Sequence, residues 1–124
     1  MDTTKIKAAA QTYLDACYES DGDKFREVFH ENAHVYGFNE KGELSDRTKD
    51  EFIGFVEGRK TPSYKPSFPR QEEILSIEFA DDKTAVVRLK VRVMNMMFSD
   101  ILGFMCLDGK WKIISKLYTG APIE

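Results

Sequence analysis

The segment that most restricts the fold of this chain is residues 98–117, FSDILGFMCLDGKWKIISKL. Asp108 and Gly109 lie between two runs of alternating apolar residues, a pattern typical of a β-hairpin with a two-residue turn. An unbroken register from this turn sets Asp100 opposite Leu117. Because successive side chains of a strand alternate between its two faces, Asp100 then lies in an otherwise apolar row. We therefore expect a pocket beside Asp100.

The neighbours of Asp100 define one wall of the expected pocket. Leu102 and Phe104 follow on the same face of the same strand. A turn at residues 95–96 sets Val91 of the preceding strand opposite Asp100. The carboxyl group then has two alternative roles: protonated, it donates a hydrogen bond to a ligand, or it is a structural acid bonded within the protein.

Hydrophobic periodicity along the rest of the chain predicts an α+β domain. Apolar residues at helical spacing predict helices at about 3–20 and 23–29, and the capping box from Thr48 to Glu51 opens a third helix. A strand at 33–38 lies between the second and third helices, and four antiparallel strands follow the third. We expect a single domain over residues 1–124, with a cone-shaped, curved antiparallel sheet whose concave face is closed by the three helices.

Composition excludes several classes of function. The 124 residues carry a net charge of −3, with 42% hydrophobic and 31% charged residues, which indicates neither a nucleic-acid partner nor a membrane surface. No apolar run has the length of a signal peptide or a membrane span, so we expect a cytoplasmic protein. Cys17 and Cys106 lie within apolar patterns, which favours free thiols, and we expect no metal site and no cofactor.

Several short motifs resemble the nuclear-transport-factor-2-like superfamily, and within it the branch named putative lumazine-binding, near the polyketide-cyclase-like proteins. These motifs are Tyr13-Leu14, FHENA at residues 29–33, Ser99-Asp100 and GKWKI at residues 109–113. The resemblance covers nearly the whole chain and implies a cone of three helices against a strongly bent sheet. The superfamily contains isomerases, dehydratases, cyclases and binding modules, so the resemblance implies the fold more strongly than an activity.

The ketosteroid-isomerase-like members give the most informative comparison. They stabilise an oxyanion with a tyrosine of the first helix and a protonated aspartic acid, and they use a separate carboxylate as general base. The resemblance puts the tyrosine at Tyr13, the acid on or beside Asp100, and the base position at Gly37. The donor pair is present and the base is missing, so we do not expect steroid-type isomerisation by that mechanism. His34 or Tyr36 supplies other proton chemistry only if a bulge turns it inward.

The sequence therefore predicts a small-molecule-binding domain whose apolar cavity is anchored by Tyr13 and Asp100, with an apolar or aromatic ligand. The rival hypothesis is an enzyme of the dehydratase or isomerase type, with Tyr13, Asp100 and His34 as candidate catalytic residues. Cys17 is either core packing or a nucleophile. The residues expected to line the pocket are Tyr13, Cys17, Val35, Tyr36, Phe55, Val91, Asp100, Leu102, Phe104 and Leu117.

Two further expectations concern the surface. The convex face of the sheet carries more apolar side chains than a solvated face needs, which predicts a homodimer through that face. Its expected members are Ile101, Gly103, Met105, Ile114 and Tyr118. The proline-rich segment 59–70 is either a cover for the pocket mouth or a plain surface connection.

Overall fold

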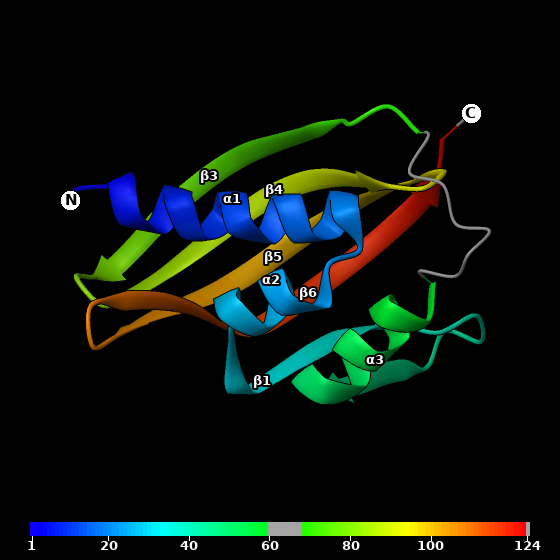
Figure 1. Ribbon diagram of the computed structural model, residues 1–124, viewed down its shortest axis with the longest axis horizontal. Helices are drawn as coiled ribbons and strands as arrows, with labels where there is room; N and C mark the ends of the chain where they lie inside the picture. Colours follow the sequence, from blue (N-terminus) through cyan, green and yellow to red (C-terminus); the bar gives the residue numbers. More distant parts are fainter. Residues whose placement is uncertain (60–67, 124) are drawn as a thin grey trace.

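The computed structural model describes residues 1–59 and 68–123, which fold into three helices and six strands (Figure 1). In chain order the elements are α1 (Thr4–Glu19), α2 (Gly22–Val28), β1 (Phe29–Phe38), β2 (Leu44–Thr48), α3 (Lys49–Arg59), β3 (Glu72–Asp81), β4 (Thr84–Val93), β5 (Met96–Leu107) and β6 (Lys110–Pro122). Strand β2 was not expected from the sequence. Most of the segment proposed as a pocket cover lies outside the described residues.

Helices α2 and α3 begin at residues whose side chains satisfy free backbone groups. Asp21 caps α2 by accepting from the backbone amides of Asp23 and Lys24. The predicted capping box of α3 is present: the amide of Thr48 donates to Glu51 at 3.0 Å, and the amide of Glu51 donates to the Thr48 hydroxyl at 3.2 Å. The third helix therefore begins where the sequence indicates.

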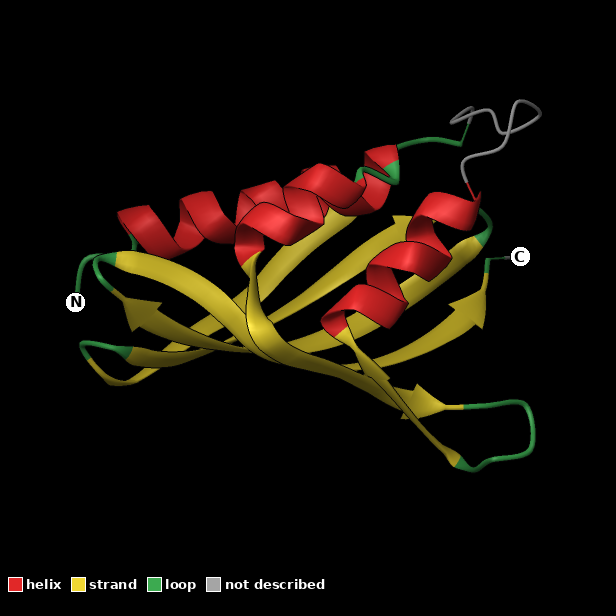
Figure 2. Ribbon diagram, turned by 60° about the horizontal axis from the view of Figure 1, so that its bottom comes forward, coloured by secondary structure: helices red, strands yellow, loops and turns green. Residues whose placement is uncertain are grey.

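The six strands form one bent sheet in the order β2-β1-β6-β5-β4-β3, and all three helices cover the same face (Figure 2). Neighbouring strands are antiparallel except β1 and β6, which are parallel, so the sheet is mixed. The parallel contact brings the N-terminal helix–strand unit beside the C-terminal hairpin. The predicted α+β cone with three helices on a curved sheet is confirmed.

The register of the β5–β6 hairpin differs from the expected one beyond its first pairs. Phe104 faces Ile113 as predicted, but the register then shifts by one residue. The extra residue is Ile114, which forms a β-bulge. Asp100 consequently faces Tyr118, so the expected pairing with Leu117 is wrong.

The position of Asp100 on the other side of its strand also differs from the prediction. The β4–β5 turn is centred on Met94 and Asn95, with a positive φ of 54° at Met94. Because the turn lies one residue earlier than expected, Leu89 faces Asp100 and Val91 faces Phe98. The side chain of Val91 nevertheless stays on the helix-covered face, since a shift of two positions preserves alternation.

An aromatic cluster fills the space between the helices and the sheet. The rings of Tyr13, Phe25, Phe29 and Phe52 pack mainly edge to face, with centroid distances from 5.1 to 6.1 Å. Open space remains at one edge of this cluster, beside Phe25 and Phe52 and toward the C-terminal ends of α1 and α3. No helix in the described part of the chain is long and apolar enough to cross a membrane.

Candidate functional site

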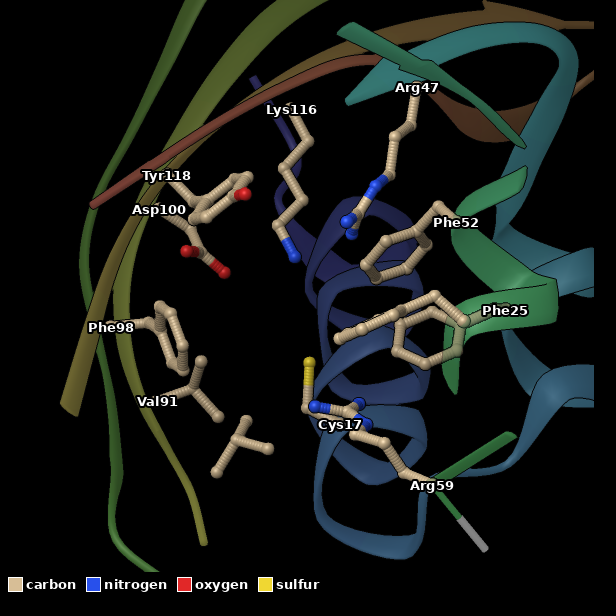
Figure 3. A pocket seen from close by; sticks show the side chains of 12 residues that line it. Cys17, Phe25, Arg47, Phe52, Arg59, Val91, Phe98, Asp100, Lys116 and Tyr118 are labelled. Carbon is tan, nitrogen blue, oxygen red and sulfur yellow. The ribbon is translucent and has the colours of Figure 1, made fainter. Parts of the chain in front are cut away.

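A cavity of about 260 Å³ lies between the helices and the inner face of the sheet. Figure 3 shows its walls: Cys17, Phe25 and Phe52 come from the helices, and Phe98, Asp100 and Tyr118 come from strands β5 and β6. The other lining residues are Arg47, Phe55, Arg59, Val91, Val93 and Lys116. The wall is therefore mostly apolar and aromatic, with a few polar groups that converge on the space, as in ligand sites generally.

Asp100 is held by Tyr13 at the edge of this cavity. Its side chain is only 2% exposed, and the Tyr13 hydroxyl donates to Oδ2 at 2.5 Å. The second oxygen, Oδ1, is buried and has no hydrogen-bond partner among the described residues. Figure 3 shows the carboxylate pointing into the cavity. A buried acceptor without a partner costs free energy, so this oxygen is available to a ligand.

Tyr13 acts as a fixed hydrogen-bond donor to Asp100. Its side chain is completely buried between α1 and the sheet, and burial together with the neighbouring Asp100 charge raises its pKa well above the usual value for tyrosine. The phenol therefore keeps its proton at neutral pH. Tyr13 itself does not border the cavity and is connected to it through Asp100.

Lys116 is the unexpected polar group of the site. Its side chain is 8% exposed, and its Nζ lies 4.5 Å from the ring centroid of Phe52, 5.3 Å from that of Tyr13 and 5.4 Å from that of Tyr118. Lysine is rarely buried without a charged partner. Here three aromatic faces stabilise the ammonium group, which points into the same cavity as Asp100 (Figure 3).

Two arginines complete the polar part of the wall. The guanidinium carbon of Arg47 lies 4.5 Å from the ring centroid of Phe55, and that of Arg59 lies 5.3 Å from the same centroid. Phe55 is half exposed and lies at the rim of the cavity. The two cations that contact its ring therefore lie at the rim as well. The cavity therefore combines one carboxylate with three cationic side chains.

Cys17 faces the cavity as a protonated thiol. Burial raises its pKa to about 12, even though the charge of Lys116 acts in the opposite direction. The thiolate is the nucleophilic form of cysteine, and it is scarce at neutral pH when the pKa is this high. This geometry favours packing over the nucleophile considered from the sequence.

The structure brings some of the sequence-predicted pocket residues together and separates others. Four of the predicted residues line the cavity: Cys17, Phe55, Val91 and Asp100. Tyr13 contacts Asp100 but does not border the cavity. Three predicted residues are fully buried in the core and do not line the cavity: Val35, Leu102 and Phe104. Leu117 does not line this cavity, because the bulge turns it to the outer face, where it is 47% exposed.

His34 and Tyr36 lie on the outer face of β1, away from the cavity. Their rings stack at 5.9 Å, and Nδ1 of His34 lies 2.6 Å from a carboxylate oxygen of Asp46 on β2. The inward bulge that a catalytic His34 required does not occur at this position, since His34 and Tyr36 keep regular pairing with β2. Tyr36 is therefore wrong as a pocket residue, and His34 does not reach the cavity.

Gly37 lies on the inner face of β1, as the resemblance implies for the general-base position. A Cβ atom at Gly37 would come within 2.5 Å of the Tyr118 ring. The space that a side chain would occupy here is thus filled by Tyr118, which was expected on the outer face. That expectation was wrong for the same reason as for Leu117: the bulge at Ile114 exchanges the two faces of the remaining strand.

Sequence reasoning missed Lys116, Arg47 and Tyr118. The sequence did contain a signal for Lys116. The two adjacent isoleucines at 113–114 break the alternation of β6 and indicate a bulge. Arg47 lies on β2, a strand whose alternation is too short and polar to distinguish its faces. Its role depends on the fold.

Comparison with known proteins assigns this chain to a family. The model of the family described as "Putative lumazine-binding" matches residues 1–119. The chain belongs to this family. A similar protein, the aldolase FrzH of Cladobotryum sp, is 25% identical over an alignment of 119 residues. The match covers 94% of this chain and 90% of that protein.

Solved structures agree with this lumazine-binding family assignment at the level of the fold. An NTF-2 like protein of unknown function from Silicibacter pomeroyi DSS-3 is 25% identical, covers 98% of this chain and 100% of its own, and superposes with a TM-score of 0.83. A ketosteroid isomerase-like protein from Erwinia carotovora atroseptica SCRI1043 is 16% identical, covers 96% of each chain, and has a TM-score of 0.73. The nuclear-transport-factor-2-like fold is thus confirmed.

Proposed function

We propose that this chain binds a flat small molecule in the cavity beside Asp100, with the Tyr13–Asp100 pair as polar anchor. The observation that carries the proposal is the buried Oδ1 of Asp100, which has no partner among the described residues and faces an open space with aromatic walls. A hydroxyl or amide donor on the ligand would satisfy this oxygen. The aromatic walls would contribute apolar contact on both faces of a ring.

The proposal is tested with 2-naphthol, a neutral two-ring fluorescent probe with one hydroxyl donor. We expect one molecule to bind per chain, with a change in its emission, and we expect Asp100→Leu to weaken binding by about tenfold or more. Asp46→Leu is the matched control, since that carboxylate lies on the outer face beside His34. If neither 2-naphthol nor the related 2-naphthoate binds the folded protein at millimolar concentration, the proposed function is wrong.

A second candidate is an enzyme that transfers protons in the same cavity. It is favoured by a buried carboxylate oxygen that shares the cavity with the ammonium group of Lys116, because a carboxylate can remove a proton while a cation stabilises the resulting oxyanion. The relative from Cladobotryum is named an aldolase. Exchange of the α-protons of 2-tetralone in deuterated water, followed by NMR, separates the candidates: exchange that depends on Asp100 supports the enzyme.

We also propose that two copies associate through the outer face of the sheet. Apolar side chains exposed there lie on neighbouring strands: Val86 at 38%, Ile101 at 42%, Met105 at 41% and Leu117 at 47%. Leu117 replaces Tyr118 in this surface because of the bulge. Sedimentation velocity should show a dimer at micromolar concentration and a monomer for Ile101→Lys. A wild-type monomer in this range contradicts the proposal.

A further inference from the structure

We infer that the cavity selects ligands that carry an anionic oxygen group, and that Lys116 and Arg47 hold this group while Asp100 accepts from a donor elsewhere on the ligand. This inference rests on the proposed function and specifies its ligand class: a flat aromatic or conjugated acid, such as a carboxylate or an ionised enol. The sequence alone indicated only an apolar or aromatic ligand.

The first support is the balance of charge. The chain as a whole is acidic, with 21 Asp and Glu residues against 18 Lys and Arg. The cavity wall reverses this balance, with Arg47 and Lys116 against Asp100. Positive charge gathered around a low-dielectric space attracts anions and is costly to maintain without one.

The second support is the contrast with cations elsewhere in the molecule. Arg26 pairs with Asp23 and Glu57 at 2.9 Å, and Lys24 pairs with Glu19. Within residues 1–59 and 68–123, neither Arg47 nor Lys116 forms an ion pair with a carboxylate, and their recorded partners are aromatic rings. A ring face attracts the cation but leaves its N–H donors without acceptors.

The third support is the position of Lys116 relative to Asp100. Asp100 pairs with Tyr118 and Leu102 pairs with Lys116 across β5 and β6, so the two charged residues are diagonal neighbours on the inner face. Diagonal neighbours in a sheet are about 7–8 Å apart at the backbone. The structure records no ion pair between them, and Figure 3 shows both charged groups directed into the cavity.

The positions of Lys116, Arg47 and Asp100 require a ligand whose two ends differ in charge. An anionic oxygen would accept hydrogen bonds from the amine of Lys116, with the guanidinium of Arg47 at the β2 side of the cavity. A second anion beside Oδ1 of Asp100 would be repelled, so that end of the ligand must be a donor or neutral. The aromatic rings of Phe52, Phe98 and Tyr118 leave space for a planar body between the polar ends.

The test compares three two-ring probes by fluorescence: 2-naphthoate, 6-hydroxy-2-naphthoate and the neutral 2-naphthol. We expect 2-naphthoate to bind at least about tenfold more tightly than 2-naphthol, because a charge-assisted hydrogen bond is added. We expect 6-hydroxy-2-naphthoate to bind most tightly, since it satisfies Asp100 as well. Added salt should weaken the binding of both acids more than that of 2-naphthol.

Variants assign the preference to particular side chains. Lys116→Met keeps the length and apolar volume of the side chain and should remove most of the preference for 2-naphthoate while leaving the affinity for 2-naphthol within about twofold. Arg47 lies at the rim of the cavity, so Arg47→Gln should destabilise the fold less than a change in the core. It should reduce the preference for 2-naphthoate by a smaller factor than Lys116→Met does. Lys90→Met and Arg88→Gln, both on the outer face of β4, are the matched controls and should leave the preference unchanged.

The outcomes distinguish this inference from the proposed function. If no probe binds, the proposed function fails and the inference fails with it. If 2-naphthol binds as tightly as 2-naphthoate, or if Lys116→Met and Arg47→Gln both keep the preference for the acid, the cavity binds small molecules but the inferred anion selectivity is wrong.

Discussion

Replacement of Tyr13 by phenylalanine is expected to lower the free energy of unfolding by about 2 kcal/mol or more at neutral pH. The phenol donates the only recorded hydrogen bond to the Asp100 side chain, at 2.5 Å, and the change leaves both carboxylate oxygens buried without a partner in the described residues. Urea denaturation followed by circular dichroism measures the loss. The volume of the core hardly changes, so the effect reports the hydrogen bond and not packing.

A double-mutant cycle separates the bond from the two residues that form it. Because apolar replacement of both partners removes the unsatisfied groups together, Tyr13→Phe with Asp100→Leu should be at least about 1 kcal/mol more stable than the sum of the single changes predicts. Additive effects would show that Tyr13 and Asp100 are not energetically coupled. Ligand binding is measured in the same variants, so that a structural acid and a ligand-binding acid can be distinguished.

Replacement of Gly37 by alanine is expected to destabilise the protein by about 1–3 kcal/mol. The new Cβ would lie 2.5 Å from a carbon of the Tyr118 ring, far closer than two carbon atoms can approach. Either β1 moves away from β6, or Tyr118 moves into the cavity. Thermal and urea unfolding measure the loss of stability, and weaker 2-naphthol binding in the folded variant reports closure of the cavity.

The control for this change is a glycine that has free space. Apart from its chain neighbours and the backbone of its own helix, no atom of the described residues lies within 4 Å of a Cβ at Gly54 in α3. Gly54→Ala should therefore stabilise the helix by about 0.5–1 kcal/mol. Removal of the obstructing ring tests the mechanism directly: Gly37→Ala should cost less in a Tyr118→Ala background than in the wild type. An equal cost in both backgrounds would show that the close contact with Tyr118 is not the cause.

Much of the fold was predictable because its signals are local. The Asp108-Gly109 turn, the capping box at Thr48 and the apolar periodicity of the helices each depend on neighbours within a few residues. Strand β2 was missed because residues 44–48 are mostly polar and show no clear alternation. The strand forms through its pairing with β1. The parallel pairing of β1 with β6 is a contact between distant segments, which no local pattern contains.

The candidate site could be predicted only in part. An acid in the apolar row of β5 indicated where polar chemistry meets the core, and the tyrosine of the first helix was correctly associated with it. The register error had the larger effect, since one extra residue at Ile114 turned Leu117 outward and brought Lys116 and Tyr118 inward. A single bulge thus placed a buried lysine in a pocket that was expected to be apolar.

Local sequence signals predict all the elements except β2, the α+β class and the presence of Asp100 in an apolar row, because helix caps, turn residues and side-chain alternation act over short distances. Three features follow from the packing of the whole chain: the Tyr13 hydroxyl bonds to Asp100, Tyr118 fills the space beside Gly37, and cations from β2, α3 and β6 meet in one cavity. These contacts depend on the strand register and on packing between distant segments. One unpaired residue in β6 therefore governs which side chains a ligand would contact.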